Sequence, residues 1–503
     1  MSEKFNIQKN NIKLDKKLEG AAKVENEEKT ISLPEAAQSV VDVEARTKNV
    51  DTHVKKNKVF MKIKLKLGLL YLDEGDFLRE ATDEVSLDSM LELRGAVTEM
   101  KPKTAVQISQ VNTELINQGL QAKICYKLNI FVEGYLEETY EVVTSMEGTR
   151  EVKVKKETLL LENMVKQEYH IEEIYPEIRL PEEASRILKI DVTPSVKSTE
   201  VKQQNVNVKG ELNEQIYYVN LQGVVCHYHE NVPFQLSIGM PEASPEQVFY
   251  ISTDSILENY HLNEEDPVQL RETISLVSLV TVEETREVSL VTHVAAPGLK
   301  VNRIGLSGES RVMETSLGDM LSKVIHLSGG ISEIFQLKAE LFYQSPEVQE
   351  NRVTVEGELA VKLFYRDEQG EFSIYRENYP VRFSGVVSTL EPGNRIEVTE
   401  AVVEEASYQQ NDQEEVELNI YCRLDLKIKE TLKEEAVLSV EEVPLPVDVP
   451  TKIYIMQEGD NLDKVSWRFQ VPVEDLQEAN PEINDPGSVY SGQKIRIPVG
   501  KKE

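Results

Sequence analysis

A pair of histidines gives this sequence its one suggestion of metal chemistry. In the segment Cys226-His227-Tyr228-His229 the two imidazoles are two residues apart. On a β-strand they would share one face, where two imidazoles could bind a metal ion. The matching positions of two related segments, described below, carry other residue types: Glu80 with Thr82, and Ile374 with Arg376. We therefore interpret the pair as part of an ordinary strand and expect no metal site.

The sequence contains no motif typical of a catalytic site. It has no phosphate-binding glycine loop, no Gly-x-Ser-x-Gly elbow, no His-Glu-x-x-His and no Cys-x-x-Cys. Carboxylates are abundant, but no motif selects a pair for acid–base work. We therefore expect no enzymatic activity and no cofactor, and we look for binding surfaces instead.

The segment 452–498 has the pattern of a small binding domain. A short strand, KIYIM, leads to Gly459-Asp460, and apolar residues at helical spacing follow in two short runs. The second run ends at Asn480-Pro481, and a closing strand, KIRIP, completes a strand–helix–helix–strand order. Asp460 is expected to cap the first helix. Trp467 is the only tryptophan of the chain, and we expect it to be exposed there as a protein-docking anchor.

Three copies of one apolar pattern, spaced 147 residues apart, fill most of the remaining chain. The openings ISLPEAA, IRLPEEA and IHLSGGI begin at Ile31, Ile178 and Ile325, and strictly alternating strands follow each one. Such alternation is typical of half-buried β-strands, and such repetition is typical of one folding unit used three times. We expect three tandem antiparallel β-domains, each a small sandwich, arranged as a semi-rigid array. Cys125 and Cys422 are interpreted as one buried core position seen twice, and the pattern leaves open whether the segments 150–177 and 298–324 are connectors or strands.

The composition argues against some classes of partner for this chain. The formal net charge is −32, and no basic stripe appears, so a nucleic-acid partner is not expected. No window approaches 18 consecutive apolar residues, so no transmembrane segment is expected either. The first 20 residues lack the apolar core of a signal peptide, and three cysteines suit a reducing compartment. We expect the protein to remain in the cytoplasm.

The C-terminal segment resembles a LysM domain. The match rests on Tyr454, Gly459, Asp460, Val465, Leu476, Ala479, Asn480, Pro481, Gly492, Gln493, Ile495, Ile497 and Pro498. In that family a groove between two loops holds N-acetylglucosamine chains, and the resemblance implies the same groove here. The implied glycan- or partner-binding residues are Gly459, Asp460, Asn461, Leu462, Asn480, Pro481, Glu482 and Ile483. Saccharide binding and protein docking through Trp467 both remain open, and the groove residues could also simply build the fold.

The three repeats resemble the SPOCS domain, also called DUF3794, through their openings and through the strand that follows them. That strand contains V-x-G-E-L in the second and third copies, and it closes on Tyr71, Tyr218 and Tyr365 in the three copies. Several SPOCS domains before a LysM domain is the arrangement of the SipL-like spore-coat morphogenetic proteins. The resemblance implies a non-enzymatic scaffold in endospore coat assembly, made in the mother-cell cytoplasm and recruited to the forespore surface. It also implies the coat morphogenetic ATPase SpoIVA and other coat proteins as partners. The alternative is a cell-wall protein that binds peptidoglycan.

The predicted organisation follows from these patterns. The fold class is mainly β, with a small βααβ domain at the end. The predicted segments are a disordered lead-in at 1–30, repeat 1 with its connector at 31–177, repeat 2 with its connector at 178–324, repeat 3 at 325–440, a Pro-rich linker at 441–451 and the LysM domain at 452–498. The sequence does not indicate the oligomeric state or which repeat would contact which partner.

Overall fold

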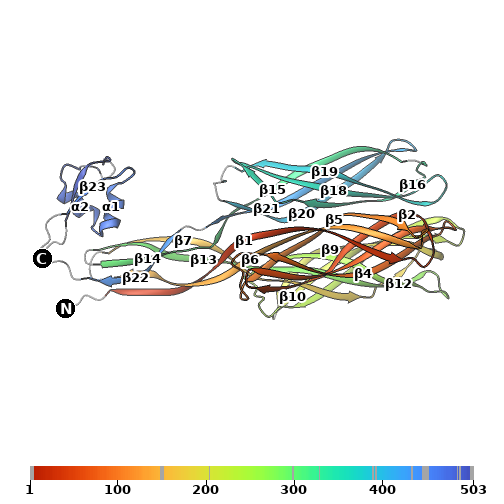
Figure 1. Ribbon diagram of the computed structural model, residues 1–503, viewed down its shortest axis with the longest axis horizontal. Coiled ribbons are helices and arrows are strands. Elements are labelled where there is room, and N and C mark those ends of the chain that lie inside the picture. Colours follow the sequence, from red (N-terminus) through yellow and green to blue (C-terminus); the bar gives the residue numbers. More distant parts are fainter. Residues whose placement is uncertain are drawn as a thin grey trace.

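A computed structural model shows a β-protein whose described residues include two short helices near the C-terminal end (Figure 1). The structure describes residues 5–147, 152–202, 204–296, 299–327, 329–387, 390, 394–431, 434–443, 452–483, 485 and 489–498. Within this part of the chain, no helix combines the length and apolarity needed to cross a membrane. The prolines of the predicted linker, at 444, 446 and 450, lie outside the described residues.

The first repeat is built from six long strands in two antiparallel sheets. One sheet has the order β1-β6-β5 and the other β2-β3-β4. Alternate side chains of both sheets point inward and form one apolar core, as period-two alternation predicts. The strands are β1 (Asn6–Ser32), β2 (Ala37–Lys55), β3 (Lys58–Asp73), β4 (Leu78–Glu92), β5 (Lys101–Ile116) and β6 (Gln121–Glu147).

The second and third repeats have the same strand order and each has its own core. The second comprises β7 (Lys153–Ile174), β8 (Glu177–Arg179), β9 (Ala184–Lys202), β10 (Asn205–Asn220), β11 (Val225–Gly239), β12 (Val248–Leu262) and β13 (Gln269–Ala295). The third comprises β15 (Glu309–His326), β16 (Glu333–Tyr343), β17 (Glu347–Gln349), β18 (Arg352–Arg366), β19 (Phe372–Val386), β20 (Arg395–Gln410) and β21 (Glu415–Thr431). The expectation of three antiparallel β-domains is therefore confirmed.

Each repeat begins one strand earlier than the sequence pattern indicated. The prediction of a disordered lead-in is wrong from residue 6 onward. This segment forms most of β1, which pairs with β6 from Asn6 to Ser32. In the same way β7 pairs with β13, and β15 pairs with β21. The described parts of the two undecided segments are thus strands. Long pairing with a partner about 90 to 140 residues away stabilises a polar sequence that shows no local signal of its own.

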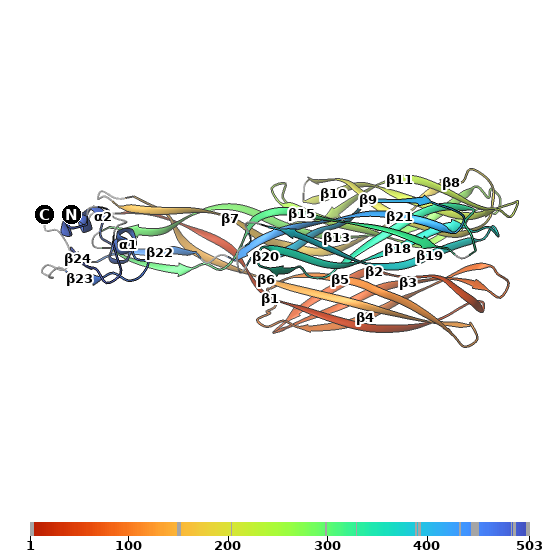
Figure 2. The same cartoon turned by 90° about the horizontal axis from the view of Figure 1, so that it is seen from above.

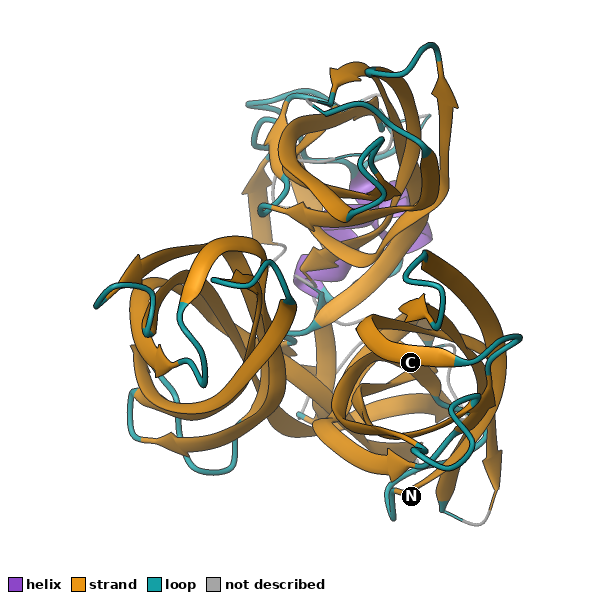
Figure 3. Cartoon of the chain, turned by 90° about the vertical axis from the view of Figure 1, so that its right-hand side faces the viewer, coloured by secondary structure: helices purple, strands orange, loops and turns teal. Residues whose placement is uncertain are grey.

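The three repeats lie side by side around a common axis (Figure 3). Residues at equivalent positions of the repeats meet in one apolar cluster between them. The equivalent sets in this cluster are Leu70, Tyr217 and Phe364; Val41, Leu188 and Phe335; and Leu78, Val225 and Phe372. The expected array is therefore wrong in its geometry, since the copies form a head with approximate threefold symmetry.

A second layer of interdomain contacts is charged and buried. Lys427 Nζ lies 2.8 Å from a Glu283 carboxylate oxygen and 3.0 Å from one of Glu162, which belongs to the first strand of the second repeat. Lys429 Nζ lies 2.9 Å from Glu397 Oε2, and Lys103 of the first repeat also pairs with Glu397. Ions removed from water are tolerated only when they are closely paired. This network therefore fixes the mutual orientation of the repeats.

A stalk extends from the head (Figure 2). It is formed by the far ends of the β1–β6 and β7–β13 pairs and by the short pair β14 (Leu299–Gly305) and β22 (Glu435–Glu442). Apolar residues from all three pairs share small cores; examples are Val143, Val291 and Val437. Each repeat thus contributes one two-stranded ribbon to the stalk.

The two repeat cysteines are not equivalent. Cys422 is buried, whereas Cys125 is exposed, so the interpretation of one shared core position is wrong. Pairing of Ile31 with Ala122 and of Ile325 with Val416 sets an offset of 294 residues between these strands. The two cysteines are 297 residues apart, which is three more than this offset. Because side chains alternate between the two faces of a strand, an odd displacement places them on opposite faces.

Candidate functional site

The C-terminal domain consists of β23 (Lys452–Ile455), α1 (Leu462–Phe469), α2 (Val473–Ala479) and β24 (Lys494–Ile497). The two strands pair in antiparallel fashion, and both helices pack on the pair through a compact apolar core. The βααβ order expected from the sequence is confirmed. The domain lies at the stalk, at the end of the molecule away from the head (Figure 1).

The loop before α1 is held by its own side chains. Asp460 accepts hydrogen bonds from the Tyr454 hydroxyl at 2.6 Å and from the Gln457 amide at 3.0 Å. These two bonds, the hydroxyl first, lower the pKa of the Asp460 carboxyl. The helix cap is Asn461, whose Oδ1 accepts from the Lys464 amide at 2.8 Å, so the expectation that Asp460 caps this helix is wrong. Both side chains are thereby committed to shaping the loop.

The loop after α2 depends on Asn480. Its side chain is fully buried, and its amide donates to the carbonyl oxygens of Leu476 and Arg496, each at 2.7 Å. Its Oδ1 accepts from the Arg496 amide at 2.6 Å. Both amide hydrogens and one of the two lone pairs of Oδ1 are thus used inside the domain. Asn480 joins α2 to β24 and is not free to contact a ligand.

The eight predicted groove residues range from buried to exposed, with Asp460 and Asn461 half-buried. Leu462 and Ile483 are part of the same apolar core, which brings the bases of the two loops together. Gly459, Pro481 and Glu482 are exposed on the loops. Gly459 has a φ of +80°, and a Cβ built there meets nothing within 4 Å, so its glycine serves the turn and leaves open space. The exposed part of the predicted groove is therefore small.

Trp467 contacts the stalk. Its ring centroid lies 5.1 Å from that of His293 on β13, and the side chain is half-buried. Beside this contact, Lys153 of β7 forms an ion pair with Glu474 of α2. The sequence-based expectation of an exposed tryptophan is thus wrong, since an element more than 150 residues earlier in the chain covers one side of it.

The open face of the β23–β24 pair was missed in the sequence. Ile453 and Ile455 are 63% and 53% exposed, which is unusual for two isoleucines on one strand face. Their cross-strand neighbours are Arg496 and Lys494, respectively. An exposed apolar pair with a basic border is a feature of interaction surfaces. The alternation in KIYI placed Ile453 and Ile455 on one face of a strand, but it did not indicate which face the helices would cover.

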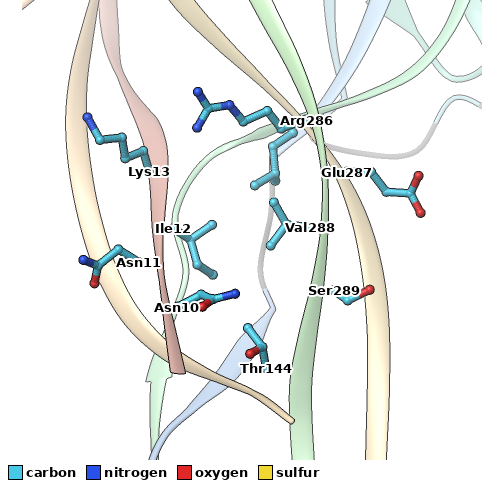
Figure 4. A pocket seen from close by; sticks show the side chains of 10 residues that line it. Asn10, Asn11, Ile12, Lys13, Thr144, Arg286, Glu287, Val288 and Ser289 are labelled. Carbon is cyan, nitrogen blue, oxygen red and sulfur yellow. The ribbon is translucent and has the colours of Figure 1, made fainter. Parts of the chain in front are cut away.

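A solvent-open hollow lies in the stalk and not in the C-terminal domain (Figure 4). Its volume is about 410 Å³, and it opens widely to solvent. It is lined by Asn10, Asn11, Ile12, Lys13, Thr144, Leu161, Arg286, Glu287, Val288 and Ser289. None of the sequence-predicted site residues lines it, and Arg286 is already paired with Glu284.

His227 and His229 do not form a metal centre with neighbouring ligands. His227 Nε2 lies 2.6 Å from Gln215 Oε1, and the ring stacks on Tyr217 at a centroid distance of 5.0 Å. Among the described residues, no group of three or more His, Cys, Asp and Glu side chains is arranged to hold a metal ion. His227 instead packs in the contact between the second and third repeats.

Comparison with known proteins agrees with this architecture. The family model described as the SipL SPOCS domain matches residues 36–116, 183–263 and 330–411, and the LysM domain model matches residues 454–498. Each SPOCS match covers the four middle strand positions of a repeat and omits its first and last strands.

One curated protein, the SpoIVD-associated factor A of Bacillus subtilis (strain 168), is 36% identical over 47 residues. That match spans 9% of this chain and 12% of the relative. No solved structure matches the chain.

Proposed function

We propose that this chain, which belongs to the SipL-like proteins through its three SPOCS domains and its C-terminal LysM domain, is a non-enzymatic scaffold of endospore coat assembly. Its place would be the mother-cell cytoplasm, at the forespore surface. The observation that carries the proposal is the union of both domain types in one chain. The name of the Bacillus subtilis relative, a factor associated with another sporulation protein, supports the same setting.

The architecture suits a scaffold. The head buries its repeat-to-repeat surfaces in an apolar cluster and a charged network, so it would present its outer faces as one body. The stalk holds the LysM domain away from that body (Figure 2). A protein of this form would connect a partner at the LysM end with others on the head.

In this proposal the LysM domain docks on the coat morphogenetic ATPase SpoIVA. The docking surface would comprise the exposed pair Ile453 and Ile455, and the side of Trp467 that His293 leaves uncovered. Two facts support protein docking over saccharide binding. Asn480 is used up by internal hydrogen bonds, and two of the other seven predicted groove residues, Leu462 and Ile483, are core residues. Large apolar side chains in a partly desolvated setting are typical anchors of protein interfaces.

The second candidate is binding of peptidoglycan through N-acetylglucosamine chains. The exposed loop residues Gly459, Pro481 and Glu482 favour it, because backbone groups and an apolar ring at a loop edge suit sugar hydroxyls and sugar faces.

Two parallel binding assays separate the candidates. The full chain and a truncation ending at Val443 are each incubated with purified SpoIVA and sedimented with purified peptidoglycan. We expect the full chain to bind SpoIVA and the truncation to lose that binding. Retention of the full chain by peptidoglycan only, with no SpoIVA complex, would contradict docking and favour the second candidate.

A further inference from the structure

Two carboxyl side chains face each other inside the core of the second repeat. Glu214 lies on β10 and Glu272 on β13, and their exposed fractions are 0% and 3%. Both point inward in strands whose neighbouring inward residues, such as Leu212 and Ile274, are fully buried and apolar. The two carboxyl groups lie within hydrogen-bonding reach of one another. An apolar interior is an unfavourable place for one carboxylate and a worse place for two.

The other two repeats show what this position normally holds. One period before and after Glu214 stand Leu67 and Val361. The last strands of the three repeats, β6, β13 and β21, are aligned through equivalent cross-strand pairs. These pairs are Ile31 with Ala122, Ile178 with Leu270 and Ile325 with Val416. Two residues further along, the side chains matching Glu272 are Ile124 and Leu418, so both other copies have an aliphatic pair that is fully buried. The acidic pair is therefore a property of the second repeat alone.

The surroundings of the pair offer no neutralising charge. Among the described residues, neither carboxylate has an ion-pair partner, and neither finds a hydrogen-bond donor while both are ionised. Opposite Glu214, β9 places Val192 and β11 places Glu230, another acid; opposite Glu272, β12 places Tyr260. Burial first, and then the charges of Glu272 and Glu230, raise the pKa of Glu214. Burial also raises the pKa of Glu272.

We propose that Glu214 and Glu272 share one proton and make the second repeat a pH-sensitive part of the head. The protonated carboxyl donates to the ionised one, and this charge-assisted hydrogen bond supplies the donor that each otherwise lacks. Loss of the shared proton leaves two facing carboxylates in an apolar core. The second repeat then loosens, while the first and third keep their aliphatic cores.

The direction of the pH effect follows from the two raised pKa values. In the unfolded chain both acids titrate near about 4.3. Because the folded pKa values lie above that, the folded state binds more protons over the intervening range. The contribution of the pair is therefore most favourable at acidic pH and is lost progressively as the pH rises through the folded pKa values.

A variant that carries the residues of the third repeat at both positions tests this pair within the full chain. In the double variant Glu214→Val with Glu272→Leu, we expect hydrogen-exchange protection in β10 and β13 to change less between about pH 5.5 and about pH 8.5 than in the wild type. The difference should approach roughly tenfold per pH unit for each group that titrates. The charged interdomain network is present in both proteins, so its own pH dependence cancels. Equal pH dependence in the two proteins would overturn the proposal.

A second measurement needs no repacking of the core. The single variant Glu214→Gln keeps the size of the side chain and can donate to Glu272 at every pH. We expect the infrared spectrum of the wild type at neutral pH to contain the carbonyl band of a protonated carboxyl that the variant lacks. Identical spectra would show that both acids are ionised, and would overturn the shared proton even if the double variant failed to fold.

Discussion

Replacement of Tyr217 by alanine should separate the repeats rather than merely loosen one of them. The side chain is fully buried on β10 of the second repeat, yet three of the four rings that contact it, those of Phe335, Phe364 and Phe372, belong to the third. Its ring stacks on Phe364 at 5.3 Å between centroids and contacts Phe372 at 4.9 Å. Its hydroxyl donates to Gln336 Oε1 at 2.6 Å. The variant thus removes a ring from the contact on which the head depends.

The magnitude follows from the burial of that ring. Removal of a fully buried aromatic side chain costs about 3–5 kcal/mol, and each 1.4 kcal/mol corresponds to roughly a tenfold change in an equilibrium. The open head should therefore become about two to four orders of magnitude more populated in Tyr217→Ala. The variant Tyr217→Phe keeps the ring and loses only one hydrogen bond, which is worth about 0.5–1.5 kcal/mol.

Hydrogen exchange of the full chain measures this change strand by strand. Protection should fall in β10 and, because the contact is shared, also in β18 on the other repeat. The matched control is Tyr175→Ala, since Tyr175 is 67% exposed and its removal should change stability by less than about 0.5 kcal/mol. A loss confined to β10, or a loss no larger than that of the control, would refute a head held together by equivalent residues.

Four further predictions concern the LysM domain, its contact with the stalk and the charged network. Trp467→Ala should weaken SpoIVA binding by at least roughly tenfold in a titration, whereas Glu482→Gln should leave it unchanged; the reverse order would remove docking through this tryptophan. Asn480→Ala should unfold the LysM domain at a lower temperature, because it leaves buried backbone groups unpaired at about 1–3 kcal/mol, and an unchanged melting profile would contradict its structural role. Trp467 is the only tryptophan, so His293→Ala should shift the fluorescence emission of the full chain to longer wavelength. Burial and two nearby cations lower the pKa of His293, so acidification of the wild type below about pH 6.5 should shift the emission in the same direction. An emission that stays constant in both experiments would exclude the contact between Trp467 and His293. Lys427→Met should destabilise the head by about 3–5 kcal/mol in denaturant titration, because the buried carboxylates of Glu162 and Glu283 lose their nearest cation. A neutral effect would show that the network carries no such cost.

Local patterns in the sequence predicted strands with a clear alternation of apolar and polar residues. They missed strands whose formation depends on pairing with a distant segment. The alternation from Val59 to Tyr71 marks β3 without ambiguity, since every second residue there is buried. Residues 6–30 lack such a pattern, because much of β1 lies on an open sheet face where polar side chains are tolerated. No local signal separates such a strand from a disordered segment, and its partner β6 lies more than about 90 residues further along the chain.

The arrangement of the repeats could not be read from any single copy. Tyr217 and Phe364 look like ordinary alternating positions in their own strands, and only the presence of equivalent residues at the matching position makes them a shared cluster. The site shows the same limit. The motif located Asn480 and Trp467 correctly in the chain, but it did not reveal that one is consumed by internal hydrogen bonds and that the other lies against His293.

The location of a fluorescent fusion in sporulating cells tests the proposed scaffold most directly, with the full chain compared with the truncation ending at Val443. A spore-coat scaffold directed by its LysM domain predicts a ring around the forespore for the full chain and a diffuse mother-cell signal for the truncation. Diffuse signal from both proteins, or labelling of the vegetative cell wall, would contradict a scaffold of this kind.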